Sequence, residues 1–190
     1  MTTVLGAAAL AAPVRAAKEC SFLLPESLGD SLGRLHPGAQ VLSLNQLRRS
    51  ERRLFKKAEG RRCPGIVHLD FFGDHREAYG VVLVTGAAAQ RRLRLILASR
   101  MEGASAWKIE TLDTRKDPGL ATVAKEPPGV YEDIHHKKKI QASAETLLWV
   151  CWGKSTILYA WTGEEIDKIW LKTSAPNRSP SRSSRLRTAD

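Results

Sequence analysis

Two separated motifs could together form a catalytic serine site. Residues 29–33 read Gly-Asp-Ser-Leu-Gly, which matches the G-x-S-x-G pattern of a serine nucleophile at Ser31. Asp133 and His136 have the D-x-x-H spacing that could supply an acid and a general base. Such a nucleophile must be exposed on a sharp turn between a strand and a helix. The residues around Ser31 therefore decide whether this chemistry is available.

The local pattern around Ser31 predicts a helix. Leu28, Leu32 and Leu35 recur at i, i+4 and i+7, and a proline suits the first helical position. The two motifs resemble those of G-D-S-L esterases, which have a parallel α/β fold, whereas the later part of this chain shows hairpin signals. We therefore expect a helix over residues 25–35 and no catalytic residue. A GDSL-like serine esterase centred on Ser31 is the enzymatic alternative.

A second helix is expected to carry many of the basic residues of the domain. Residues 43–46 read Ser-Leu-Asn-Gln, which has the spacing of a capping box, and Gly60 would end the helix. From Arg48 to Arg62 the chain has eight basic residues against two glutamates. The predicted apolar stripe comprises Leu47, Leu54, Phe55 and Ala58, and the predicted basic face comprises Arg48, Arg49, Arg52, Arg53, Lys56 and Lys57.

The predicted basic face is a candidate surface for an anionic partner. The formal net charge of the chain is +10, and a basic domain attracts polyanions such as nucleic acid, anionic lipid or acidic cell-wall polymers. Recognition of bases would need aromatic residues among the cations, and the one aromatic residue of this segment, Phe55, belongs to the apolar stripe. The candidate binding residues are Arg49, Arg52, Arg53 and Lys56, and the alternative is a solvated charged face.

After Gly60 the apolar pattern changes from helical to β. Residues 39–44 already form a short predicted strand, and further strands are expected near residues 66–71, 78–84, 93–99, 107–112, 130–134, 146–152, 156–161 and 165–171. Thr162-Gly163 separates the last two by a tight loop, which predicts a hairpin. The predicted fold class is α+β: a single domain with two N-terminal helices followed by an antiparallel β-meander that the helices cover.

The two ends of the chain differ in composition from this domain. Residues 1–16 are predicted to be a signal peptide, because an apolar run too short to span a bilayer precedes small residues. Residues 17–173 form the domain, and residues 174–190 are a basic Ser/Arg/Pro-rich tail that we expect to be disordered. The predicted location is periplasmic or secreted, with no membrane span; a cytoplasmic protein with an Ala-rich arm is the alternative.

Cysteines and tryptophans supply further candidates. An exported chain tends to pair two of its cysteines, and Cys63 and Cys151 flank predicted strands, so we expect a Cys63–Cys151 disulfide. The chain has no C-x-x-C pair, which disfavours zinc. Trp161 and Trp170 lie in the last strands, where an exposed tryptophan row could bind a partner; core packing is the alternative.

The segment from Gly65 to Val84 contains a loop that resembles the calcium loop of FG-GAP/VCBS-type repeats. Asp70, Gly73 and Asp74 match the D-x-[ND]-G-D-G-x-x-D pattern, but other ligand positions are replaced. Calcium takes six to eight oxygen ligands, and two aligned carboxylates are too few. We therefore expect no metal and no cofactor, and a turn in which Asp70 or Asp74 hydrogen-bonds the backbone.

The motif order of the domain resembles a group of small exported bacterial proteins of unknown function. The shared order is Leu-Pro-Glu, then Cys-Pro-Gly and the Asp70 loop, then Pro-Pro-Gly with Tyr-Glu-Asp, then ILYAWTG. This resemblance implies one exported domain with one repeat-like loop, and it implies no catalytic residue. The sequence supports an exported, non-enzymatic domain that binds an envelope component or another macromolecule. A cytosolic, non-specific nucleic-acid-binding protein that uses the basic helix at residues 45–62 is the further alternative.

Overall fold

The structure is a computed structural model that describes Cys20 and residues 23–86, 90–103, 105–116, 121–152 and 154–172. The predicted signal peptide and the predicted C-terminal tail lie outside the described residues. The elements in chain order are α1 (Glu26–Leu35), β1 (Gln40–Val41), the 3-10 helix η1 (Leu44–Gln46), α2 (Arg49–Glu59), β2 (Ile66–Leu69), β3 (Ala78–Thr85), β4 (Arg92–Arg100), β5 (Trp107–Lys116), β6 (Ala121–Glu126), β7 (Gly129–Glu132), β8 (Lys139–Ala142), β9 (Thr146–Cys151), β10 (Ser155–Trp161) and β11 (Ile166–Leu171).

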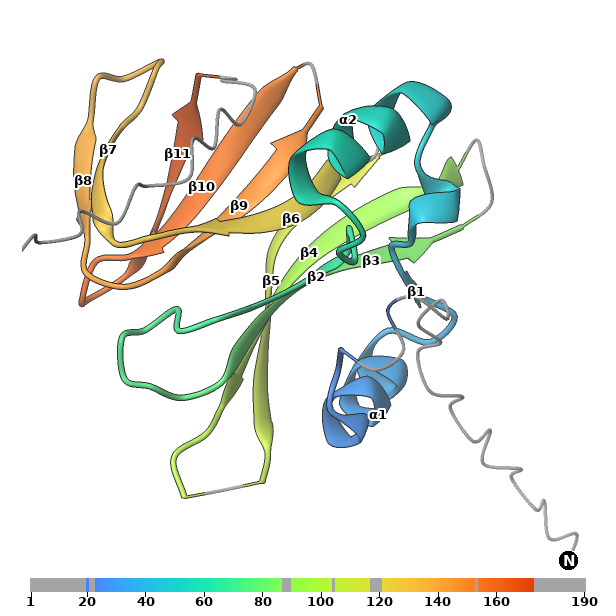
Figure 1. The fold of residues 1–190 in the computed structure, drawn as a ribbon. Coiled ribbons are helices and arrows are strands. Elements are labelled where there is room, and N and C mark those ends of the chain that lie inside the picture. The colour runs from blue at the N-terminus through green and yellow to red at the C-terminus, as the bar shows by residue number, and fades with distance from the viewer. Residues whose placement is uncertain are drawn as a thin grey trace, which may run out of the picture.

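The strands form two packed antiparallel sheets and a separate hairpin. The first sheet has the order β1-β3-β4-β5, with β2 also pairing with β3; the second has the order β11-β10-β9-β6; β7 pairs with β8. One apolar cluster fills the space between the two sheets. A second joins α1 to the outer face of the first sheet, and a third joins the β7–β8 hairpin to the outer face of the second. The molecule therefore has four layers, with α1 and the β7–β8 hairpin outermost (Figure 1).

The α+β prediction is wrong, because the molecule is mainly β and its strands do not form one meander. All residues of β3 from Ala78 to Val84 are buried, so both faces of the first sheet need a covering layer. The helices are too short to supply both layers, since α2 buries only Phe55. The second sheet covers the inner face instead, and it begins with β6, which the sequence pattern did not predict. The β8 strand was also missed.

The first predicted helix is confirmed and the second begins later than predicted. Leu28 and Leu32 of α1 are buried against the first sheet. The capping box at Ser43 opens the short 3-10 helix η1, and a new helix, α2, starts at Arg49. Leu54 of the predicted apolar stripe is exposed. The predicted strands near 66–71 to 165–171 all correspond to observed strands, and the Thr162-Gly163 hairpin joins β10 to β11.

One edge strand of the first sheet is split in two by the segment that carries α2. β1 and β2 are both antiparallel to β3, and they lie end to end along the same side of it. They meet at Val82, whose carbonyl accepts a hydrogen bond from Leu42 N at 2.9 Å and whose N–H donates to Gly65 O at 2.8 Å. Residues 43–64 thus leave the sheet and return to the point of departure. The chain passes so close at this junction that a Cβ on Gly65 would lie 2.5 Å from Leu42 O.

The disulfide joins Cys20 to Cys63, and this corrects the predicted Cys63–Cys151 pair. Cys63 belongs to the apolar cluster beneath α1, whereas Cys151 belongs to the cluster between the sheets. The two side chains are therefore on opposite faces of the first sheet. Cys151 is a buried free thiol. A disulfide of this kind is typical of proteins in oxidising compartments.

Asp133 fastens the loop after β7 to the edge of the second sheet. Its carboxylate accepts hydrogen bonds from the backbone N–H groups of His135, His136 and Trp170, at 2.7, 2.7 and 2.9 Å. The bond from Trp170 N and those from His136 and His135 hold the pKa of Asp133 below its usual value, against the opposing effect of burial. Because the carboxylate is ionised more easily in the folded chain, its contribution to stability is complete above the unfolded pKa of about 4 and is lost as the pH falls through the folded value.

We expect the melting temperature of the Asp133→Asn variant to fall less with acidification than that of the parent. The amide presents an N–H donor toward one of the three backbone donors, so the melting temperature at neutral pH falls as well. The measurement is the melting temperature of both proteins from pH 7 to pH 3. Asp30→Asn on the exposed side of α1 is the control. Parallel curves for the Asp133 variant and the parent below pH 5 would contradict this role.

Candidate functional site

The structure does not assemble the candidate serine site. Ser31 lies within α1, where its Oγ donates a hydrogen bond to Ser27 O at 2.8 Å. Asp133 and His136 follow β7 of the hairpin that forms the outermost layer on the other side of the molecule (Figure 1). The Asp133 carboxylate is bonded to backbone N–H groups. The two motifs are therefore structural features of separate layers.

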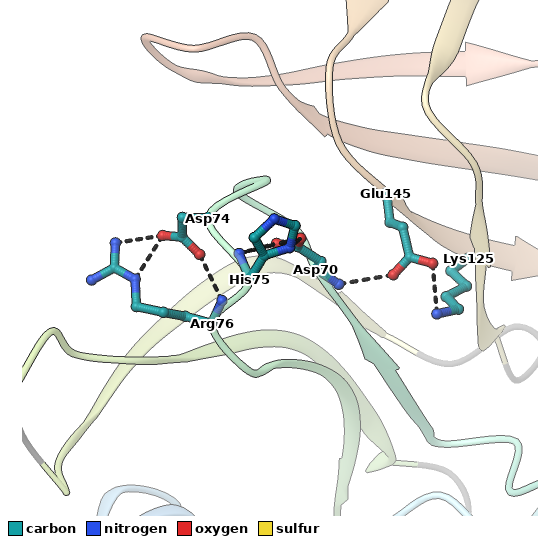
Figure 2. Close-up of polar contacts among 6 residues, drawn as sticks. All are labelled: Asp70, Asp74, His75, Arg76, Lys125 and Glu145. Carbon is teal, nitrogen blue, oxygen red and sulfur yellow. Dashed lines mark hydrogen bonds and ion pairs between the residues drawn. The ribbon is translucent and has the colours of Figure 1, made fainter.

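The loop between β2 and β3 is a turn closed by its own charged side chains, as Figure 2 shows. Asp70 accepts a hydrogen bond from His75 N at 3.3 Å, and Asp74 accepts one from Arg76 N at 3.0 Å. The side chains of Asp74 and Arg76 are also in direct contact, and the hydrogen bond from Arg76 lowers the pKa of Asp74. His75 and Gly73 have positive φ angles, which give the turn its shape. The prediction that these aspartates bond the loop backbone is confirmed.

Glu145 connects this loop to the second sheet. Its carboxylate accepts a hydrogen bond from Asp70 N at 2.8 Å and pairs with Lys125 Nζ at 2.7 Å (Figure 2). Although burial opposes ionisation, these two contacts hold the pKa of Glu145 below its usual value. Within the part of the chain that the structure describes, no group of three or more His, Cys, Asp or Glu side chains could hold a metal ion. The geometry assigns this loop a role in joining the sheets.

The tryptophans proposed as binding residues face the interior of the sandwich. Trp161 packs edge-on against Phe72 with ring centroids 5.2 Å apart, and Trp170 packs against the cluster between the sheets. Arg115 of β5 lies 4.4 Å from the ring centroid of Trp149 and 5.5 Å from that of Trp170. These contacts make the aromatic residues of β9, β10 and β11 packing groups, which removes the basis for an exposed tryptophan row.

A polar cluster between β5 and the last two strands lies beside these aromatic residues. Asp113 of β5 accepts hydrogen bonds from Tyr159 Oη at 2.9 Å and from Lys168 Nζ at 2.7 Å. Burial and the adjacent carboxylate raise the pKa of Tyr159, so the phenol stays protonated as a donor. Burial opposes ionisation of Asp113, but the bonds from Lys168 and Tyr159 hold its pKa below the usual value. This cluster joins the two sheets.

Positive charge gathers at the end of the sandwich where α2 lies. Phe55 of α2 packs against Trp152 at the end of β9, with ring centroids 6.1 Å apart. The register of β4 and β5 places Arg92 opposite Lys116 at the corresponding end of the first sheet. We call this surface the basic end and define it by the exposed cations Arg49, Arg53, Lys56, Lys57, Arg92 and Lys116.

Four cations of the basic end have no acidic partner within the part of the chain that the structure describes. In the described residues no carboxylate lies within ion-pair distance of Arg49, Arg53, Lys56 or Lys57. The two glutamates of α2 are occupied elsewhere: Glu51 accepts from Arg48 N at 3.0 Å and Glu59 pairs with Arg62 at 3.0 Å. The exposed cations of α2 thus remain available to a partner.

Arg52 differs from its neighbours on α2. It is half-buried, and its Nη2 donates to the carbonyl oxygens of Asn45 and Leu47, both at 3.1 Å. These bonds hold α2 against the preceding 3-10 helix. Of the predicted binding residues on this helix, the structure leaves Arg49, Arg53 and Lys56 exposed and assigns Arg52 to the fold.

The opposite end of the sandwich carries most of the acidic loop residues. The connections β2–β3, β4–β5, β8–β9 and β10–β11 contain Asp70, Asp74, Glu77, Glu102, Glu145, Glu164 and Glu165. Cations at this end are neutralised, since Arg76 pairs with Asp74 and Arg100 pairs with Glu77. Charge is therefore segregated along the strand direction, which the amino-acid composition alone does not reveal. The register of the strands is what places Arg92 opposite Lys116 at this end of the first sheet.

Comparisons with known proteins supply no further assignment. The chain matches no protein-family model, no curated protein and no solved structure. No helix among the described residues is long and apolar enough to cross a membrane.

Proposed function

We propose that this protein is an exported, non-enzymatic domain that binds an anionic polymer of the cell envelope through its basic end. The observation that carries the proposal is the exposed row of arginines and lysines on α2, for which the described residues supply no acidic partner. Folded proteins commonly intersperse charges of both signs on their surface, and unneutralised cations on one face raise the local concentration of polyanions. Binding of this kind needs no catalytic group and weakens as salt concentration rises.

The disulfide supports an extracytoplasmic setting for this binding. The Cys20–Cys63 bond closes a loop that contains both α1 and α2, so the binding helix belongs to the part of the chain that oxidation stabilises. Disulfides persist in the periplasm and outside the cell and are rare in the cytosol. An acidic envelope polymer fits that compartment better than nucleic acid does.

Reversing the charge of two α2 residues tests the proposal. We expect Arg49→Glu/Arg53→Glu to weaken binding to alginate, a polymer of uronate carboxylates, by about tenfold or more, because two attractive contacts become repulsive. The measurement is the dissociation constant at several NaCl concentrations. Loss of contacts also makes the dependence of affinity on salt shallower.

Lys108→Glu/Lys139→Glu is the matched control, since it changes the net charge by the same amount. Lys108 and Lys139 are exposed, lie outside α2, and pair with Glu110 and Glu132 on the sheet surface. The control variant should bind within about threefold of the parent, because both lysines lie outside the basic end, and it should stay folded, because exposed ion pairs contribute little to stability. Equal losses in both variants would show that net charge alone drives binding. Tighter binding to duplex DNA than to alginate at equal salt would favour the nucleic-acid alternative.

A further inference from the structure

The first turn of α2 offers more than a diffuse positive charge. Arg49, Ser50 and Arg53 line an open hollow of about 580 Å³ on the surface of the basic end. Residues four apart on a helix lie on the same side, so the two guanidinium groups border this hollow together. Each guanidinium is a planar fork of N–H donors that matches the oxygens of a carboxylate or phosphate, and the serine hydroxyl can donate a further bond.

The lysines of α2 continue the same surface beyond the hollow. A helix rises about 1.5 Å per residue, so Lys56 and Lys57 lie about 4.5 and 6 Å along the axis from Arg53. All four cations are exposed, and in the described residues no carboxylate lies within ion-pair distance of them. The surface therefore presents an arginine pair followed by a lysine pair. The offset of the lysines from Arg53 is roughly the length of one monomer in an extended polymer.

We infer that the Arg49–Ser50–Arg53 hollow is an anchoring subsite for one oxyanion of an extended polyanion, with Lys56 and Lys57 binding the next anionic group along the chain. This inference rests on the proposed function and adds a geometric requirement to it. A subsite built from guanidinium forks depends on the shape of the side chains, whereas attraction by charge alone does not. The face has no aromatic side chain, since Phe55 is buried, so the polymer is recognised by its charges and their spacing.

Substitutions that preserve the charge can distinguish these two modes of binding. Arg49→Lys/Arg53→Lys preserves the net charge but replaces both planar forks with point charges. We expect it to weaken binding of hexagalacturonate about tenfold at constant salt, and Lys108→Arg/Lys139→Arg, the matched control outside the basic end, to change binding less than about threefold. Linear hexaphosphate in the same assay distinguishes a phosphate-bearing source from a carboxylate-bearing one, because the probe bound more tightly identifies the preferred oxyanion.

The spacing is tested by shortening the probe. Lys56→Gln/Lys57→Gln should weaken binding of the hexamer at least threefold and leave binding of monomeric galacturonate, followed by NMR shifts of the Ser50 amide, within error of the parent. Unchanged hexamer affinity in the Arg→Lys variant would overturn the subsite. Failure of the parent to bind alginate would instead overturn the proposed function, so the two results are distinguishable.

Discussion

Removing the Cys20–Cys63 disulfide should lower the free energy of unfolding by about 4 kcal/mol. The bond joins residues 43 apart in sequence, and the loss of loop-closure entropy in the unfolded chain scales with the logarithm of that length. For a chain of this size, such a change lowers the melting temperature by roughly 8–16 °C. The variant is Cys20→Ser/Cys63→Ser, and the measurement is thermal or urea unfolding at neutral pH.

Reduction of the parent provides the internal control for this prediction. Dithiothreitol should lower the melting temperature of the parent toward that of the double variant and leave the variant unchanged, because Cys151 is a free thiol in both. Peptide mass mapping without reduction should recover Cys20 linked to Cys63. A recovered Cys63–Cys151 peptide, or a melting temperature that reduction does not change, would refute the assignment.

A single methyl group at Gly65 should be among the most disruptive small changes in the fold. The ideal Cβ position lies 2.5 Å from Leu42 O, 2.8 Å from Leu42 Cβ and 2.9 Å from Leu42 N. Two of these atoms are backbone, and they belong to the junction at which both Leu42 and Gly65 bond to Val82. Because neither segment can retreat without breaking its bond to β3, we expect Gly65→Ala to cost about 1–3 kcal/mol.

Gly29→Ala should instead raise the free energy of unfolding. Gly29 lies inside α1, and a Cβ there would meet no atom within 4 Å. Alanine in a helix interior is more favourable than glycine by roughly 0.5–1 kcal/mol. In urea unfolding, the free energy of unfolding of the parent should therefore lie between those of the two variants. A Gly65→Ala variant as stable as the parent would mean that the junction is less crowded than the structure shows.

Local patterns predicted the elements of this fold better than their arrangement. The spacing of Leu28, Leu32 and Leu35 was sufficient for α1, and the β periodicity located most strands. The architecture depends on β6, whose sequence Ala-Thr-Val-Ala-Lys-Glu is short and only partly apolar, and which pairs with β9 about 25 residues later. Pairing at that distance is decided by packing between layers, and no local pattern encodes it.

The burial of β3 on both faces was the signal that could have corrected the fold class. A run such as Ala-Tyr-Gly-Val-Val-Leu-Val needs cover on two sides, whereas a helix that buries one phenylalanine covers little area. The disulfide was mispredicted for a related reason. Proximity of Cys63 and Cys151 to strands says nothing about which face of the sheet each side chain occupies.

Part of the candidate site was accessible from sequence. The basic residues of α2 were recognisable as a charged helix face, and Phe55 marked its inner side. The structural role of Arg52 was not, because its acceptors are carbonyl groups of a 3-10 turn that the pattern merged into the helix. The contribution of Arg92 and Lys116 required the sheet register. Cations from three separate segments reach the same end of the sandwich only after the strands have paired.

The split edge strand makes the segment that carries α2 an exchangeable insertion in the first sheet. Leu42 and Gly65 are each bonded to Val82, so β1 and β2 keep their registers on β3 whatever length of chain connects them. Residues 43–64 can accordingly gain, lose or exchange surface residues without shifting the strands, provided that Leu44, Leu47, Phe55 and Cys63 keep their places in the core and Pro64 O keeps its bond to Val123 N. Partner preference can thus diverge independently of the sandwich, which makes this segment the natural site for grafting a new specificity.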